Sequence, residues 1–226
     1  MSKSPSISVV IPTLNAAPHL TATLASVGDY ADEVVIADGG SIDDTCELAS
    51  SSGARIVQSE KGRGQQLGTG AAAATADWLL FLHADTVLPD IWVADVSAFT
   101  ADPANADRAA VFTFALDDPS PQARRMERLV AWRTRRLGLP YGDQGLLISR
   151  RYYDRLGGFR PMPLMEDVDI VRRIGRANMA VLNTRAVTSA DRYRRGGWWG
   201  RPVRNLLCLA LYFLRVPPRI LLRLYR

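Results

Sequence analysis

The sequence predicts an α/β fold in which helices flank a mostly parallel sheet. Short apolar runs alternate with helix-length segments through the first half of the chain, and this alternation is typical of right-handed βαβ units. The run at residues 78–82 is continuously apolar and bounded by polar residues, as expected of a strand buried on both faces. With 226 residues, 47% of them hydrophobic, the chain can bury one substantial core.

The first half reads as four strands separated by three helices. Pro12 has no backbone N–H to donate and should stop the first strand. Asp43 and Asp44 offer the side-chain oxygens that cap a helix start. The segment before the fourth strand is rich in alanine and reads as a helix. We expect strands at residues 7–11, 33–37, 55–57 and 78–82, and helices at 17–27, 45–51 and 65–76.

The second half is organised differently, with two further strands and two longer helices. Strands are expected at residues 108–116 and 144–149, and helices at 121–137 and 166–177. The last of these helices has an acidic first turn, which suits the positive end of its macrodipole. Neither an internal repeat nor a linker rich in Pro, Gly or Ser separates the halves, so we expect one continuous domain with a nucleotide-binding first half.

The basic charge of the chain limits the kinds of partner that it is expected to bind. The net charge is +5, and from Arg185 onward the only acidic residue is Asp191. An anionic membrane surface or a phosphorylated substrate could answer this excess, and a solvated basic face is the alternative. We expect no nucleic-acid partner, because the arginines do not accompany an exposed aromatic platform.

The cysteines and the N-terminal segment indicate the cellular compartment in which the protein is expected. Cys46 and Cys208 match no metal or redox spacing, which suits free thiols in a reducing cytosol. We see no signal peptide and expect a cytoplasmic protein.

Polar residues follow three of the parallel strands, and these loops should meet at one edge of the sheet. Ligands bind outside the carboxyl ends of strands in open α/β sheets. His83 and Asp85 end the most apolar strand, where an ionised carboxylate is costly unless it is paired or metal-bound. Asp38 precedes two glycines and could accept hydrogen bonds from a base or ribose, with a turn or helix-cap role as the alternative.

A fourth loop carries cations but not a known phosphate fingerprint. Lys61 and Arg63 alternate with glycines before a predicted helix, which suits a place beside a phosphate. Gly62, Gly64 and Gly68 have the wrong spacing for the dinucleotide motif, and the Walker loop is absent. A nicotinamide-dependent dehydrogenase is therefore disfavoured.

Taken together, these segments resemble family 2 glycosyltransferases of the GT-A fold, from Ser6 to about Arg195. His83-Ala84-Asp85 stands where that family carries Asp-x-Asp, and Glu166-Asp167 where it carries its catalytic pair. The segments that carry the rest of the resemblance are residues 8–15, the loop 38–41, the glycines and alanines of 62–74, and Leu156-Gly157-Gly158-Phe159. The residues around 139–145 and 163–168 narrow it to a small bacterial subgroup, described as transferases associated with radical-SAM or selenium-domain proteins, or with arsenosugar biosynthesis.

The resemblance implies a metal-assisted, inverting transfer of a sugar from a nucleotide-diphosphate donor to a hydroxyl acceptor that the sequence does not identify. Asp167, with Glu166, would be catalytic, and Asp85 and His83 would hold Mn²⁺ or Mg²⁺. Because histidine replaces the first carboxylate, manganese is favoured over magnesium. Donor nucleotide contacts would come from Pro12, Thr13, Asn15, Asp38, Gly39, Lys61, Arg63, Gln66, His83 and Ala84. Asp143, Gln144 and Gly145 would contact the acceptor or the donor sugar, with turn geometry as their alternative.

Two other functions stay open. A sugar-phosphate nucleotidyltransferase binds similar ligands, but it usually has a glycine-rich, arginine-bearing loop after the first strand, where this chain has Pro12-Thr13-Leu14-Asn15. A non-catalytic scaffold of the same fold would tolerate the departures at Gly39 and His83. We expect a glycosyltransferase domain over residues 1–200, with a nucleotide-binding half at 1–100 and an acceptor half at 101–200.

The C-terminal segment, residues 201–226, is both apolar and basic. The apolar run at 206–214 is shorter than the about 20 residues that span a bilayer, and Pro217-Pro218 should break any helix there. Three readings stay open: a helix packed on the domain, a homodimer interface, or an anchor on anionic lipid at the inner face of the membrane.

Overall fold

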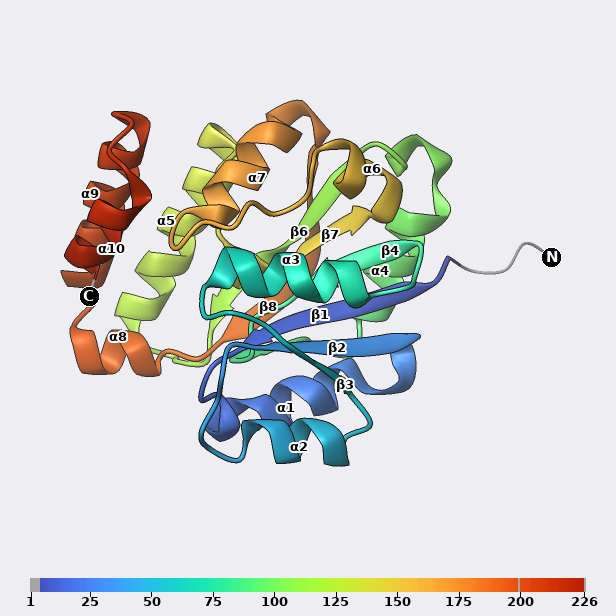
Figure 1. Cartoon of the computed structure of the whole chain (residues 1–226). Coiled ribbons are helices and arrows are strands. Elements are labelled where there is room, and N and C mark those ends of the chain that lie inside the picture. Colours follow the sequence, from blue (N-terminus) through green and yellow to red (C-terminus); the bar gives the residue numbers. More distant parts are fainter. Residues whose placement is uncertain (1–4, 199, 226) are drawn as a thin grey trace.

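The computed structural model describes residues 5–198 and 200–225, so residues 1–4, 199 and 226 of the expected domains lie outside the described part. Its centre is one eight-stranded sheet in the order β3-β2-β1-β4-β7-β6-β8-β5 (Figure 1). The sheet runs without interruption from the N-terminal to the C-terminal half, so both halves share one backbone framework.

The N-terminal half has the predicted parallel arrangement. The strands β1 (Ile7–Thr13), β2 (Glu33–Asp38), β3 (Arg55–Gln58) and β4 (Trp78–Phe81) all run in one direction. They alternate with helices α1 (Ala17–Val27), α2 (Thr45–Ser51) and α3 (Arg63–Ala73). Helix α3 covers one face of the sheet, and α1 and α2 lie on the other (Figure 1). The carboxyl ends of β1, β2 and β4 therefore meet at one edge, as the sequence predicted.

Pro12 does not stop the first strand, because nothing needs its missing N–H. β1 continues to Thr13, with Pro12 opposite Ala37 of β2. The Leu82 amide donates to the Val10 carbonyl at 3.0 Å, so the backbone groups of Val10 face β4, and those of Pro12, two residues on, face the same side. β4 has already ended at Phe81, and a proline is tolerated there.

The sheet becomes mixed beyond β4. β7 (Leu146–Ser149) is antiparallel to β4 and to β6 (Ala109–Leu116), and β8 (Met179–Thr188) is parallel to β6. A two-residue strand, β5 (Thr86–Val87), pairs antiparallel with the end of β8. β8 was not predicted: its apolar start at residues 179–182 is short and is followed by Asn183, Thr184 and Arg185, which interrupt the pattern. Its pairing with β5 brings the end of β8 beside the loop at residues 83–85.

Two apolar cores lie on the two faces of the sheet. One contains Leu20 of α1 and Trp92 of α4 (Trp92–Ala101), packed with Val9 and Ile36. The other is formed with α3, α6 (Arg150–Arg155) and α7 (Glu166–Ile174). Alternate residues of β1 point into opposite cores, as the twofold period of a strand requires. This double burial explains why the central strands are continuously apolar.

Several helix boundaries differ from the sequence prediction, and α4 and α6 were not predicted. α7 ends at Ile174 rather than 177, because Gly175 takes a positive φ of 78°. The predicted strand at 144–149 begins two residues late, since Gly142–Gln144 form a 3₁₀ turn. α3 begins at Arg63, two residues earlier than expected. Further 3₁₀ turns lie at Gly28–Tyr30, Pro103–Asn105 and Arg176–Asn178.

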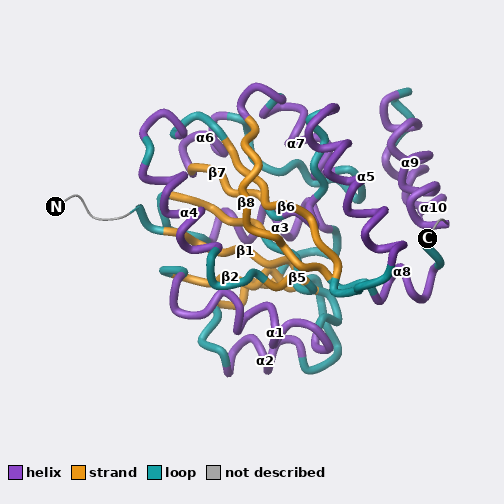
Figure 2. Tube along the Cα trace, turned by 180° about the vertical axis from the view of Figure 1, so that it is seen from behind, coloured by secondary structure: helices purple, strands orange, loops and turns teal. Residues whose placement is uncertain are grey.

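Four helices gather at one end of the molecule (Figures 1 and 2). They are α5 (Pro121–Leu137), α8 (Asp191–Gly196), α9 (Gly200–Phe213) and α10 (Pro218–Tyr225). Cys208 and Leu209 of α9 and Leu221 of α10 pack with Met165 and Val168 at the start of α7. The C-terminal segment is thus packed on the domain, with a break before Pro218 as predicted. Within the described residues, no helix has both the length and the apolar character needed to cross a membrane.

Candidate active site

A cleft of about 340 Å³ opens at the carboxyl edge of the parallel strands. Its walls come from the β1 loop, from the start of α3 and from the turn after β4. The sequence-predicted residues that line it are Pro12, Thr13, Asn15, Lys61, Arg63, Gln66, His83, Ala84 and Asp85. Its size is that of a small-molecule site. Asp38 and Gly39 do not line it.

Asp38 instead holds the loop that follows β2. Its side chain is buried, with 1% of the residue exposed. Oδ2 accepts hydrogen bonds from the N–H groups of Gly40 and Ser41 at 2.9 and 2.8 Å, and Oδ1 accepts from the hydroxyls of Thr13 and Ser41. Burial alone would raise the pKa of Asp38, but these bonds outweigh it and hold the pKa below its ordinary value. The carboxylate has the surroundings of a turn-forming residue, the alternative that the sequence left open.

Gln66 of α3 joins the ends of β1 and β2. Its Nε2 donates to the carbonyls of Thr13 and Ala37 at 2.6 and 3.0 Å. A Cβ at Gly39 would lie 3.0 Å from this amide, so the glycine leaves room for the Gln66 side chain to make these two hydrogen bonds. Asn15, with a φ of 51°, accepts from the Ile42 amide through its side chain at 2.9 Å. The carboxyl ends of β1 and β2 are therefore held together by their own hydrogen bonds.

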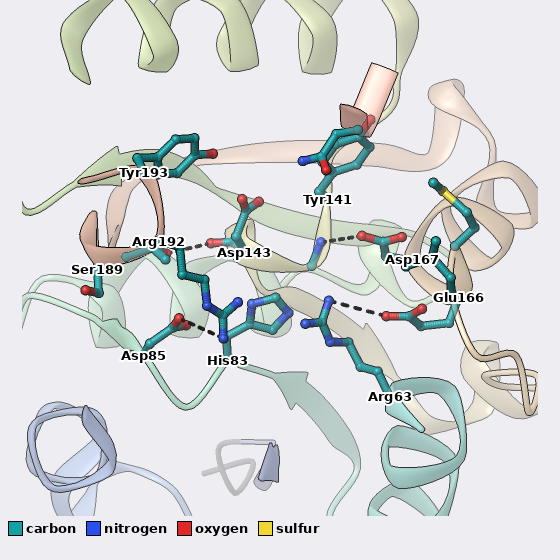
Figure 3. A pocket seen from close by; sticks show the side chains of 15 residues that line it. Arg63, His83, Asp85, Tyr141, Asp143, Glu166, Asp167, Ser189, Arg192 and Tyr193 are labelled. Carbon is teal, nitrogen blue, oxygen red and sulfur yellow. Dashed lines mark hydrogen bonds and ion pairs between the residues drawn. The ribbon is translucent and has the colours of Figure 1, made fainter. Parts of the chain in front are cut away.

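His83 and Asp85 form the corner between this cleft and a second cavity. The turn is held from outside: the Thr23 hydroxyl donates to the Ala84 carbonyl at 2.9 Å, and the Ser189 amide donates to the Asp85 carbonyl at 3.0 Å. The Asp85 carboxylate lies 3.5 Å from the Arg192 guanidinium. In Figure 3 the His83 ring stands between the side chains of Arg63 and Arg192.

The His83 imidazole is neutral in this setting. Burial lowers its pKa to about 3, with Arg63 and Arg192 acting in the same direction and Asp85 against them. A Cβ at Gly142 would lie 2.7 Å from His83 Nε2, so the ring packs against the backbone there. Only a glycine at position 142 leaves this space.

Glu166 and Asp167 stand at the N-terminus of α7, on the far wall of the second cavity. Met165, before them, adopts the left-handed conformation with a φ of 67°, which is costly for a residue with a side chain. Glu166 is only 2% exposed and lies 3.6 Å from the Arg63 guanidinium. Asp167 Oδ2 accepts from the Gly142 amide at 3.0 Å. The cluster thus joins α3, α7 and the 3₁₀ turn.

Burial dominates the charge state of Glu166. It raises the pKa of Glu166 to about 7, with the neighbouring Asp167 adding to the shift and Arg63 opposing it. A carboxyl group that titrates near neutral pH beside a second carboxylate is a common feature of acid–base sites.

The three residues at 143–145 have three different surroundings. Asp143 lines the second cavity, and its buried Oδ1 accepts no hydrogen bond within the described residues. Burial raises its pKa to about 6, against the opposing effect of Arg133. Gln144 is buried away from the cavity, where it donates to the Phe112 carbonyl and accepts from the Thr134 hydroxyl. Gly145, with a φ of 63°, packs against the Phe112 ring. Gln144 and Gly145 thus have the surroundings of the turn-geometry alternative, and their contact with acceptor or donor sugar stays a prediction.

The two cavities share one junction. Arg63, His83, Asp85 and Arg192 line both of them, while Asp143, Glu166 and Asp167 line the second alone. Figure 3 shows two cationic side chains at the centre of this arrangement, with carboxylates on both sides. A ligand extending from the first cavity into the second would lie along these four shared residues.

Sequence reasoning missed several residues of the second cavity, and Arg192 is the chief of them. Arg192 lies in a basic run after β8 that reads as a solvated face, and only the β5–β8 pairing brings it to Asp85. Tyr141 lies two residues before a predicted contact and could have been found from it. The other missed lining residues are Gly142, Leu164, Met165, Thr188, Ser189, Tyr193 and Asn205.

The side chains at the junction provide only part of the ligand set that a divalent cation needs. Asp85 offers carboxylate oxygens at the junction, and His83 a neutral ring. Among the described residues, no three acidic, histidine or cysteine side chains gather closely enough to form a metal cage. Mg²⁺ is commonly held by one or two carboxylates together with the phosphates of a substrate. The residues present therefore suit a cation that arrives with a phosphorylated ligand.

Comparisons with known proteins identify relatives of this chain. A family model described as Glycosyl transferase family 2 matches residues 8–159. A "PGL/p-HBAD biosynthesis glycosyltransferase" of Mycobacterium bovis is 38% identical over 109 residues, a match that spans 42% of each chain. A glucosyl-3-phosphoglycerate synthase of Mycobacterium tuberculosis is 33% identical over 96 residues, 37% of this chain and 30% of that protein. This chain therefore spans less than half of the length of the curated relatives that it matches.

Solved structures share the fold over a longer stretch. A crystal structure of the Mycobacterium tuberculosis glucosyl-3-phosphoglycerate synthase, in complex with Mn²⁺, UDP and glucosyl-3-phosphoglycerate, matches with a TM-score of 0.62. The match covers 90% of this chain and 79% of that one at 22% identity. Another crystal structure of that synthase contains Mg²⁺ and UDP. The likeness confirms the predicted GT-A fold.

Proposed function

This chain belongs to glycosyltransferase family 2, and we propose that it moves a sugar from a nucleotide-diphosphate donor to a hydroxyl acceptor with inversion at the anomeric carbon. The proposal goes beyond the finding that the family model matches residues 8–159. The synthase of similar fold was crystallised with Mn²⁺ and UDP-glucose, and this supports a uridine donor and a manganese or magnesium ion here.

The shared junction of the two cavities carries the proposal. The first cavity is bounded by the polar loops of the parallel strands, and the second by the carboxyl groups of α7. A donor with its nucleoside in the first cavity and its sugar in the second would bring its pyrophosphate between Arg63 and Arg192. Leaving-group charge would develop at the point where the positive charge is concentrated.

Each part of the donor has residues suited to it. The nucleoside would contact the β1 loop, with Asp38, Gly39 and Gln66 acting by holding that loop in shape. Lys61, Arg63 and Arg192 would neutralise the pyrophosphate. A cation bound by Asp85, with His83 beside it, would add Lewis-acid stabilisation of the leaving diphosphate.

The acceptor side rests on Asp167. The Gly142 amide holds its Oδ2 at 3.0 Å, leaving lone pairs that could take the proton of an acceptor hydroxyl. Glu166 orients Arg63 through their 3.6 Å contact. Asp143 would accept a hydroxyl of the bound sugar with its buried Oδ1. Inversion is consistent with a direct displacement by the acceptor.

The alternatives are weaker on specific grounds. The loop after β1 lacks the glycines and arginine usual in nucleotidyltransferases. A scaffold without activity would not need two buried carboxyl groups with raised pKa values beside a cationic junction. The bacterial subgroup, the cytoplasmic location and the homodimer stay predictions.

Release of free nucleotide diphosphate from a panel of nucleotide sugars tests the proposal. With Mn²⁺ present, we expect the protein to release UDP from at least one UDP-sugar, faster when a matching acceptor is added. Asp167→Asn is the control and should release none above background. A nucleotidyltransferase would instead release inorganic pyrophosphate from a nucleoside triphosphate and a sugar 1-phosphate, which a parallel assay supplies. No product from any donor in either assay would favour the scaffold.

A further inference from the structure

Helix α9 is apolar on two opposite faces, and only one of them is covered. Cys208 and Leu209 are buried against the start of α7. The opposite face carries apolar residues at helical spacing, all of them exposed: Val203, Leu206, Leu207, Ala210, Phe213 and Leu214. Leu206 is 65% exposed and Leu214 75%. A helix that is apolar all round is normally buried all round.

Helix α10 continues this exposed face. Ile220 and Leu224, one turn apart, are both about half exposed, while Leu221 between them is buried. The two helices contact each other and form a hairpin. Its outer surface therefore presents leucine, isoleucine and phenylalanine side chains over several turns, which is more than scattered surface residues account for.

Helix α5, at the same end of the molecule (Figures 1 and 2), has a related outer face. Leu129 and Trp132 are exposed, with Trp132 at 56%. The other exposed positions of its central and last turns include Arg125, Arg128, Arg135 and Arg136. Tryptophan and leucine among arginines, on the face away from the core, are typical of helices that lie in a membrane interface.

The charge of this surface distinguishes between two possible partners, a second copy of the chain and a lipid bilayer. Arg215 and Arg223 are exposed on the hairpin, and the acidic residue nearest along the chain, Asp191, is already paired with Arg194 at 2.9 Å. A second copy docking through the same face would bring arginines against arginines. An anionic bilayer would satisfy both the apolar and the cationic side chains.

We infer that the outer faces of α9, α10 and α5 form a docking surface for an anionic lipid bilayer, on which the helices lie without crossing it. The apolar side chains would enter the headgroup boundary while the arginines pair with lipid phosphates. Asn205 of α9 lines the second cavity, so docking would hold that cavity close to the membrane surface. The inference does not depend on the proposed reaction.

Vesicle flotation of the whole protein tests the inference. Vesicles of phosphatidylcholine alone and of phosphatidylcholine with phosphatidylglycerol are compared at low and high salt. We expect the protein to float with the anionic vesicles, and the bound fraction to fall at high salt because screening weakens the arginine contribution. Binding to anionic and neutral vesicles alike, or to neither, would overturn the inference.

Two sets of variants separate the contributions. The double variant Leu206→Glu with Leu214→Glu should lower partitioning about tenfold or more, since it places charges in the buried layer. Arg128→Glu with Arg135→Glu should remove the preference for anionic lipid. Ile91→Glu is the matched control: Ile91 is 62% exposed but stands at the start of α4, away from this surface, and its vesicle binding should equal that of the wild type.

The folded state and the oligomer are measured alongside. All variants lie on exposed positions and should keep the thermal unfolding midpoint of the wild type. Light scattering after gel filtration should show one mass for the wild type and the leucine variant. A wild-type dimer that the leucine variant converts to monomer, without vesicle binding by either, would assign this face to a second copy and contradict the inference.

Discussion

Two regions at the same edge of the sheet shift the pKa values of their buried carboxyl groups in opposite directions. After β2, Asp38 is buried but accepts hydrogen bonds from Thr13, Gly40 and Ser41, and its pKa is lowered. Around α7 and the 3₁₀ turn, Glu166 and Asp143 are also buried, yet their pKa values are raised to about 7 and about 6. The first loop satisfies its carboxylate with hydrogen bonds. In the second region Asp143 keeps a buried Oδ1 that accepts no hydrogen bond among the described residues, and Glu166 lies 3.6 Å from the Arg63 guanidinium.

The difference indicates a division of labour. Self-satisfied polar groups make a rigid frame that presents backbone and cations to a ligand. Groups with raised pKa values carry a cost in stability, and such costs concentrate where chemistry is done. We therefore expect substitutions in the first loop to lower stability and substitutions around α7 to lower activity.

The largest effect is expected at Asp167. Asp167→Asn keeps the shape of the side chain but removes the base, so turnover should fall by about 10²- to 10⁴-fold. Binding of UDP with Mn²⁺ should change little, because Asp167 does not line the first cavity. Steady-state kinetics and calorimetry measure the two effects. Asp154→Asn, on the exposed face of α6, should match the wild type; a comparable loss there would show that the assay reports stability instead of catalysis.

A smaller effect, on folding, is expected at Asp38. Asp38→Ala leaves the Gly40 and Ser41 amides and two hydroxyls without their acceptor and should lower the free energy of unfolding by about 3 kcal/mol. Urea denaturation measures this change. The control Asp44→Ala removes an exposed helix-cap carboxylate that makes no cap hydrogen bond and should cost about 0.5 kcal/mol or less. Equal losses in both variants would mean that the Asp38 network contributes little.

The smallest effect concerns the pH dependence of stability at Glu166. Its folded-state pKa is raised from 4.5 to about 7, so the folded protein holds this proton more tightly than the unfolded chain does. Stability should therefore fall as pH rises from about 4.5 to about 7, and Glu166→Gln should remove that fall, gaining about 2 kcal/mol above pH 7 relative to the wild type. Urea denaturation at about pH 5 and about pH 8 compares the two proteins. A variant with the same pH slope as the wild type would contradict the raised pKa that burial gives Glu166.

The contrast between the two loops also explains which parts of the structure could be predicted from the sequence. The strands of the first half are marked by apolar runs, and their polar loops follow at once, so β1, β2, β4 and their common edge were predicted from local pattern. Asp85 was singled out by its place at the end of the most apolar strand, whereas the catalytic role of Asp167 came through the family resemblance. Arg192 could not be placed, because its position depends on the pairing of the end of β8 with the two-residue strand β5, and the polar residues within β8 interrupt its apolar pattern. The turn role of Asp38 was the alternative left open, because its partners Gly40 and Ser41 are close in sequence. The buried role of Gln144 depends on Phe112, far away in sequence, which local pattern does not reveal.

The central claim is that a divalent cation and a nucleotide diphosphate meet at Asp85. Calorimetric titration of UDP into the wild type and into Asp85→Asn, each with Mn²⁺ and with the metal removed by chelator, tests it most directly. We predict that Mn²⁺ strengthens UDP binding in the wild type, and that Asp85→Asn loses this gain while keeping the metal-free affinity. A variant that retains the full gain from Mn²⁺ would contradict the claim.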